Sequence, residues 1–164
     1  TTVCFELRII ASTGSTIADE DKQALKEAAD ENFPNEILLK ARLLFDGGYY
    51  SRALNMLIEN KPSSFLKTER DNVEYIYRLA RIHQKTGNTL KAVSYYEMVL
   101  KDAENLPYYY AANSSLQLGL IYEEKKDFGN AKKYFKKTLF LKNHEYKNSI
   151  DQKAKAGLNR ISEK

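Results

Sequence analysis

The sequence predicts an all-α protein built as an α-solenoid of helix-turn-helix repeats. Residues of the same kind recur at an offset of 39 positions, and the apolar residues inside each recurring segment have helical spacing. The chain also has only 7 Gly and 3 Pro among its 164 residues. An all-β chain would need turn residues at about every 8–12 positions, so these counts argue against one.

The offset of 39 residues divides much of the chain into three equivalent segments. It pairs small residues with small ones and bulky residues with bulky ones, not merely apolar with apolar. The matching sets are Ala41, Ala80 and Gly119; Leu44, His83 and Tyr122; Ala53, Ala92 and Ala131; and Leu57, Tyr96 and Phe135. Because residue size recurs, the segments are expected to pack in equivalent ways. They predict three repeats, at about 34–67, 68–105 and 106–143.

Each repeat is expected to contain two antiparallel helices. In the second repeat, four residues share one helix face at the spacing i, i+3, i+4, i+7: Ile76, Leu79, Ala80 and His83. A second apolar helix follows after a short turn. Gly48 and Gly87 lie where the first helices end, at a position that needs a left-handed backbone. In the third repeat, Lys126 and Asp127 are expected to form this turn.

Both ends of the chain are expected to extend the helical array. Residues 1–33 are expected to form a leading helix or a degenerate hairpin. Residues 144–164 are expected to form a C-terminal capping helix, because the offset continues there for one helix without its partner. Lys153, Lys155 and Arg160 would turn polar groups outward from this helix, as a solvated cap requires.

The third repeat contains Ser-x2-Leu-Gly-x2-Tyr at 115–122 and Ala-x3-Phe at 131–135. This pattern resembles the tetratricopeptide repeat, whose motif is W-x2-L-G-x2-Y followed by A-x3-F and a closing Pro. The second repeat follows the same pattern with Ile76, Leu79, Ala80, His83, Ala92 and Tyr96. The resemblance covers residues 34–143 and implies a right-handed α-solenoid that serves as a protein-interaction scaffold.

The repeats also depart from the family pattern. Their period is 39 residues instead of about 34, the Trp position holds Ile or Ser, and no Pro closes a repeat. By period alone, HEAT and armadillo repeats of about 40–47 residues are an alternative, which the motif spacing disfavours. Pro107 favours a first helix beginning there in the third repeat. The long first helices and the run of tyrosines at 108–110 resemble the tetratricopeptide repeat protein 39 family, which again implies a scaffold.

The resemblance implies a binding groove on the concave side, where the first helices lie. The groove residues carried over by alignment are Asn35, Leu38, Arg42, Phe45, Tyr77, Arg81, Gln84, Asn113, Leu116, Leu120 and Glu123. The apolar members would form a strip flanked by two arginines, which suits an amphipathic helix or an extended segment with an acidic residue. The partner is a protein or peptide of unknown identity. Alternatively, the chain's own leading helix (residues 18–32) would cover the strip with its acidic face.

The C-terminal part of the chain is basic. Residues 125–164 contain 12 Lys or Arg and 4 Asp or Glu. This composition allows an alternative function, which is the binding of nucleic acid or an acidic partner. Four of the lysines have helical spacing and fit one solvated helix stripe: Lys132, Lys133, Lys136 and Lys137. A nucleic-acid partner is therefore disfavoured.

Catalysis is not expected from this sequence. One Cys and two His are too few for a Cys-based zinc site and supply few general bases. His83 falls on a predicted core face, and no constellation joins a nucleophile to an activating base. The sequence therefore predicts no catalytic residue, no metal site and no cofactor.

The sequence contains no run of about 18 apolar residues, so no segment is expected to span a membrane. We expect a soluble chain, in the cytoplasm or the periplasm. The chain begins with Thr1 and not with Met, which is typical of a processed product or of a piece of a longer chain.

Overall fold

The described part of the chain, residues 35–162, contains helices and no strand. The structure is a computed structural model. Its helices are α3 (Glu36–Asp46), α4 (Tyr50–Glu59), α5 (Pro62–Phe65), α6 (Glu69–Lys85), α7 (Thr89–Ala103), α8 (Tyr110–Glu124), α9 (Phe128–Phe140) and α10 (Lys147–Ser162). The all-α prediction is confirmed, whereas the leading helix or hairpin expected in residues 1–33 lies outside the described residues.

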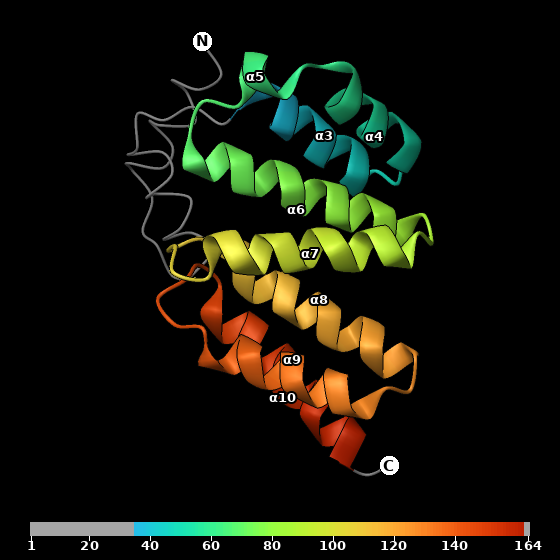
Figure 1. Cartoon of the computed structure of the whole chain (residues 1–164), viewed down its shortest axis with the longest axis vertical. Coiled ribbons are helices and arrows are strands. Elements are labelled where there is room, and N and C mark those ends of the chain that lie inside the picture. The colour runs from blue at the N-terminus through green and yellow to red at the C-terminus, as the bar shows by residue number, and fades with distance from the viewer. Residues whose placement is uncertain (1–34, 163–164) are drawn as a thin grey trace, which may run out of the picture. The chain divides into compact units, whose positions relative to one another are not determined.

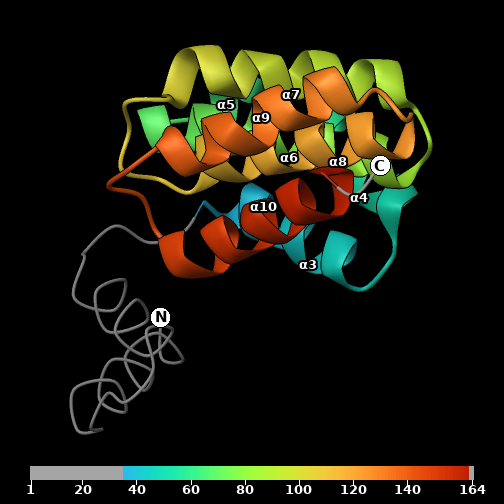
Figure 2. The same cartoon turned by 90° about the horizontal axis from the view of Figure 1, so that it is seen from below.

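The helices form a stack of hairpins. The pairs α3–α4, α6–α7 and α8–α9 follow one another, and α10 packs against both α8 and α9 (Figure 1). Seen along the stack, α7 and α9 lie on one side of α6 and α8, while α3 and α10 lie on the other (Figure 2). Each hairpin falls within one of the segments that the offset distinguishes. The predicted solenoid of helical hairpins is therefore confirmed.

Polar side chains fix where several helices begin. Asn35 caps α3, Asn88 caps α7 and Asp127 caps α9, each by accepting hydrogen bonds from backbone N–H groups of the first turn. Thr68 and Asp71 form a capping box at the start of α6. These caps satisfy N–H groups that have no partner within the helix, and they set the register of each hairpin.

The buried core repeats at the same offset as the sequence. The three alanines Ala53, Ala92 and Ala131 each have 0% of their surface exposed. The bulky residues that follow them by four positions are also 0% exposed: Leu57, Tyr96 and Phe135. Residues at equivalent positions are therefore buried to the same extent, as the recurrence of residue size predicts.

Helix α6 connects the first hairpin to the others. Leu79 and Ile82 belong to the apolar cluster of α3, α4 and α5. Val73, Tyr77 and Ala80, on another side of the same helix, belong to the cluster that α7–α10 complete. The core is therefore continuous along the stack, because each hairpin buries one face of the next.

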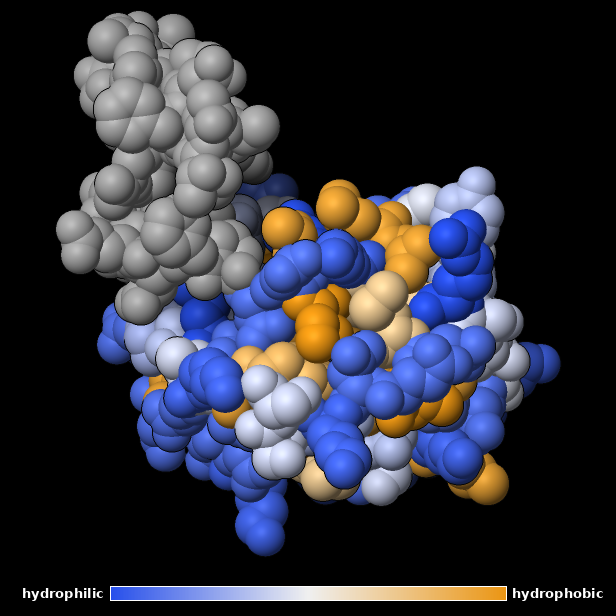
Figure 3. All heavy atoms as spheres, turned by 90° about the horizontal axis from the view of Figure 1, so that it is seen from above, coloured by the Kyte–Doolittle hydropathy of each residue, from blue (hydrophilic) through white to orange (hydrophobic). Residues whose placement is uncertain are grey.

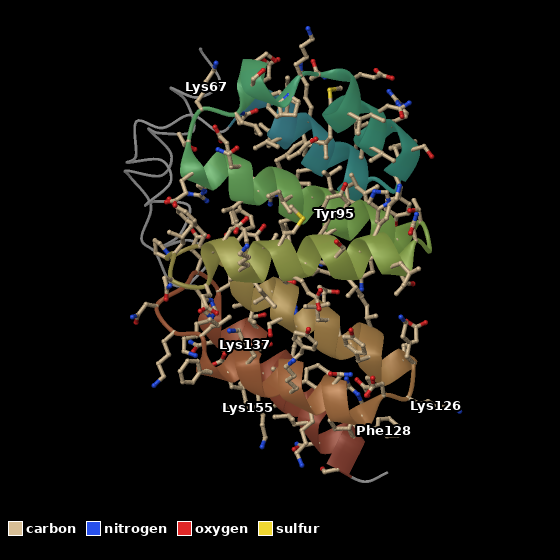
Figure 4. All side chains as sticks on the ribbon, viewed as in Figure 1. Lys67, Tyr95, Lys126, Phe128, Lys137 and Lys155 are labelled. Atoms are coloured by element: carbon tan, nitrogen blue, oxygen red, sulfur yellow. The ribbon has the colours of Figure 1, made fainter. Side chains whose placement is uncertain are left out.

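The turns between paired helices use the left-handed backbone that the sequence predicts. Gly48 and Gly87 have φ of 81° and 79°. The third turn places Lys126 at the equivalent position, with φ of 60° (labelled in Figure 4). A lysine in this conformation brings its Cβ close to the following carbonyl, which glycine avoids.

The prediction that the first helix of the third repeat begins at Pro107 was wrong. Helix α8 begins at Tyr110. The carbonyl of Pro107 accepts a hydrogen bond from the backbone N–H of Glu145, at 3.3 Å, and so belongs to the connection instead of to the helix. The connection between the first two hairpins contains the additional short helix α5, whereas the second hairpin contains long helices, with 17 residues in α6 and 15 in α7.

The Phe135 ring lies between two glycines of neighbouring helices. A Cβ at Gly119 of α8 would lie 2.5 Å from the ring, and a Cβ at Gly157 of α10 would also lie 2.5 Å from it. Real Cβ atoms do not approach a ring so closely. Both helices can therefore contact α9 at this depth only because these two positions have no side chain.

We predict that Gly119→Ala destabilises the protein by about 1–2 kcal/mol, because overpacking exceeds the gain in helix propensity. Gly129→Ala is the matched control, since a Cβ there would have its nearest neighbour at 3.7 Å. That change should raise stability slightly. Chemical denaturation monitored by circular dichroism measures both, and equal effects of the two substitutions would contradict the tight contact at Phe135.

We also predict that Lys126→Gly stabilises the protein by about 1 kcal/mol, because glycine relieves the left-handed strain. Lys126→Ala removes the same charge but keeps the strained backbone, so it should give no such gain. The free energy of unfolding of the two variants separates charge from conformation. A stabilisation that is the same for both would show that the lysine charge is responsible.

Candidate functional site

The first helices of the three hairpins present polar and aromatic side chains on one surface, which we call the first-helix face. We define it by Arg42 and Phe45 of α3, Arg81 and Gln84 of α6, and Gln117 of α8. The Arg81 guanidinium carbon lies 5.3 Å from the centroid of the Phe45 ring. The Gln84 side-chain amide donates a hydrogen bond to the Gln117 carbonyl oxygen, at 3.2 Å. These contacts join α3 to α6 and α6 to α8.

The expected open apolar strip is mostly not at the surface. Leu38, Tyr77 and Leu116 are 1%, 3% and 1% exposed, and each belongs to the apolar core. Of the four strip residues, Leu120 alone is half-buried. Tyr77, for example, packs its ring against Tyr96 of α7 and Tyr110 of α8, so its side chain points into the contact between hairpins and not toward solvent.

The arginines of the first-helix face form no buried ion pair among the described residues. Arg42 is exposed, and its ion pair with Asp46 is long, at 3.7 Å, and also exposed. Arg81 is half-buried, has no carboxylate within ion-pair distance in the described residues, and its buried Nε has no hydrogen-bond partner. Burial raises the pKa of the Tyr77 phenol, and this effect exceeds the opposite effect of Arg81 and Arg78. The phenol therefore stays neutral.

Other predicted groove residues are used within the fold. Asn35 caps α3 and donates from its amide to the carbonyl of Phe65, at 2.6 Å. Asn113 accepts a hydrogen bond from the Gln117 amide, at 3.1 Å. Glu123 accepts two hydrogen bonds from the Arg160 guanidinium, at 2.8 Å each, which tie α8 to α10. The sequence predicted that Arg160 turns its polar group outward from the capping helix. In the structure this group instead pairs with Glu123 of α8.

A buried polar cluster near the first-helix face was not predicted from the sequence. Glu74 accepts hydrogen bonds from the guanidinium of Arg78, at 2.6 and 3.0 Å, and from the hydroxyl of Tyr110, at 2.7 Å. Arg70 lies over the Tyr108 ring and reaches Glu145 at 3.5 Å. The spacing i, i+4, i+8 of the three α6 residues was the available signal. The cluster ties α6 to α8 and to the connection before α10.

His83 is a core residue, as the sequence predicts. Its side chain is 9% exposed and stacks on Tyr95 of α7, with ring centroids 5.6 Å apart (Tyr95 is labelled in Figure 4). Burial lowers its pKa, and the nearby Lys91 lowers it further. Within the described residues, no group of three or more His, Cys, Asp or Glu could hold a metal ion.

A second charged surface lies on α9. Lys132, Lys133 and Lys136 are exposed, and no carboxylate forms an ion pair with them in the described part of the chain. Lys133 lies 5.3 Å from the centroid of the Tyr134 ring. Lys137 differs from these three, because it forms an ion pair with Glu104. Among the described helices, none is long and apolar enough to cross a membrane.

Comparison with known protein families supports the repeat assignment. A family model described as the tetratricopeptide repeat matches residues 72–141, which run from α6 to the end of α9. Comparisons with curated proteins and with solved structures gave no match. The narrower resemblance to the tetratricopeptide repeat protein 39 family has no support in these findings. Residues 72–141 are therefore similar to tetratricopeptide repeats.

Proposed function

We propose that the chain is a non-catalytic interaction module that binds an acidic segment of a partner protein on its first-helix face. Tetratricopeptide repeats generally mediate contacts between proteins. The observation that carries the proposal is the pair Arg42 and Arg81, which lie one 39-residue period apart on successive first helices. Among the described residues, neither arginine is held in a buried ion pair.

The chemistry of these residues defines the segment. A guanidinium that packs over an aromatic ring can still donate hydrogen bonds from its edge, so Arg81 can donate to a carboxylate while packing on Phe45. The equivalent position in the third repeat is Leu120, which is half-buried and apolar. A matching segment therefore carries carboxylates toward α3 and α6 and an apolar side chain toward α8. An extended segment or one helix face can satisfy this order.

We predict that peptides selected from a random library against the full chain are enriched in Asp and Glu beside an apolar residue. Arg42→Glu, Arg81→Glu and Leu120→Glu should each weaken binding of such a peptide at least tenfold. For the two arginines, the reason is that a charge-assisted hydrogen bond contributes about 1.5–3 kcal/mol, and about 1.4 kcal/mol is tenfold in affinity. For Leu120, the new carboxylate would have to be buried against the apolar side chain of the peptide. Fluorescence anisotropy with labelled peptide measures the change.

Arg52→Glu is the matched control. Arg52 also lies over an aromatic ring, 5.4 Å from the centroid of Tyr49, but it belongs to the second helix α4. This variant should bind the peptide like the natural chain. Arg81→Gln serves as a milder change if Arg81→Glu does not fold. If none of the three first-helix substitutions changes the affinity for the peptides, this binding face is refuted.

A second candidate function is the binding of nucleic acid or of an acidic partner through α9. The exposed lysines Lys132, Lys133 and Lys136, which have no ion pairs in the described region, are the observation that favours it. Phosphate binding releases counterions, so its affinity falls steeply as salt rises.

For this second candidate, we predict that replacing the three lysines by Gln lowers the salt slope of duplex binding by about 3, at about 0.9 per phosphate contact, and that of single-strand binding by about 2, at about 0.7. Filter binding of a single-stranded and a duplex oligonucleotide between low and moderate salt measures the slope. Binding that is absent, or that hardly changes with salt, eliminates the candidate. Conversion of Lys101, on α7, to Gln is the control.

A further inference from the structure

The outer side of α3 differs from the equivalent side of the later first helices. Leu43 of α3 is 61% exposed. At the same position one and two periods later, Ile82 and Ile121 are 1% and 3% exposed. In the later repeats this side is covered by the preceding hairpin, and no described residue covers it on α3.

A second position on this side changes its chemistry. In α6, α8 and α10 it holds residues that are buried against the preceding hairpin, whereas α3 holds Lys40. The series is Lys40, Leu79, Leu118 and Gly157. Leu79 and Leu118 are 5% and 0% exposed, and Gly157 contacts the ring of Phe135. A helix covering α3 would therefore meet a cation where the other first helices present an apolar or small residue.

We define the α3 end face by Glu36, Lys40 and Leu43, which lie at i, i+4 and i+7 and so form one stripe. Glu36 and Lys40 form an ion pair whose side chains are 78% and 56% exposed. An exposed pair of this kind contributes little stability, so Lys40 can exchange Glu36 for another carboxylate. Figure 3 views this end of the stack, where hydrophobic residues reach the surface between hydrophilic ones.

We propose that the α3 end face docks one amphipathic helix of a partner protein, with its apolar stripe on Leu43 and a carboxylate on Lys40. Two facts determine this occupant. The equivalent sides of the later first helices are covered by helices, α3 and α4 against α6 and α7 against α8, so the shape that fits is a helix. The exchange of Leu79 or Leu118 for Lys40 adds the requirement for a negative charge.

A second copy of the chain fits this face less well. Stable contacts between two folded proteins involve about 20–30 residues on each side. Helix α3 has 11 residues, and the buried side of that helix already belongs to the core. A single helix needs only one stripe of its partner, and this is what the α3 end face offers.

The test is a selection from a library of helical 20-residue peptides displayed on a constant scaffold. The full chain is the target, and its Leu43→Glu variant is used for counter-selection. We expect enriched helices with an apolar stripe and an Asp or Glu beside it. Leu43→Glu should weaken them at least tenfold, as should Lys40→Glu. A peptide in which that carboxylate is replaced by Lys should regain binding to the Lys40→Glu variant.

Two controls separate this face from others. Leu90→Glu changes another exposed leucine, on α7 and 81% exposed, and should leave binding unchanged. Arg81→Glu should also leave it unchanged, so failure here is distinguishable from failure of the proposed first-helix face.

Several results would overturn the proposal. One is the absence of enriched helices, and another is enriched helices whose affinity does not change with Leu43→Glu or with the charge exchange. A third is a concentration-dependent dimer, seen in sedimentation, that Leu43→Glu abolishes. A marked fall in the melting temperature of Leu43→Glu would also overturn it, because the chain itself would then cover this face.

Discussion

The contact of Phe135 with two glycines is the constraint on which the arrangement of the last three helices depends. Gly119 and Gly157 approach the same ring from α8 and α10, and neither position has room for a side chain. The ring therefore fixes how far each helix lies from α9 and at which turn it crosses. With α10 held in this register, Arg160 reaches Glu123 across the interface with α8. The ion pair adds to a contact that steric fit has already determined.

The same close packing determines what remains for a partner. Leu38, Tyr77 and Leu116 lie where helices of the stack pack together, and for this reason they are core residues. Long side chains escape this burial because their polar ends reach past the contact, as Arg81 does over Phe45. The first-helix face is consequently polar and basic at its centre, and recognition there depends on hydrogen-bond geometry more than on apolar area.

The sequence predicted the features that recur. Ala53, Ala92 and Ala131 recur in sequence and are equally buried, and the left-handed turns lie one period apart. It did not predict contacts that occur once. The cluster around Glu74 depends on Tyr110 and on a connection whose length no repeat motif encodes. The burial of the apolar strip depends on how closely successive hairpins pack. Periodicity determines which face a residue occupies, whereas the distance to the next helix decides whether that face is open.

The two ends of the described stack differ in the residues they carry on the side that no further described hairpin covers. An internal hairpin has both sides covered, but a terminal one exposes a side that was apolar in its neighbours. At α10 the exposed positions include Lys153 and Lys155, which suit water. At α3 the change is incomplete, because Lys40 replaces a leucine while Leu43 keeps an apolar side chain that is 61% exposed. A side adapted only to water would have polar residues at both of these positions. Keeping one apolar residue beside one cation is what an interface with an amphipathic helix requires.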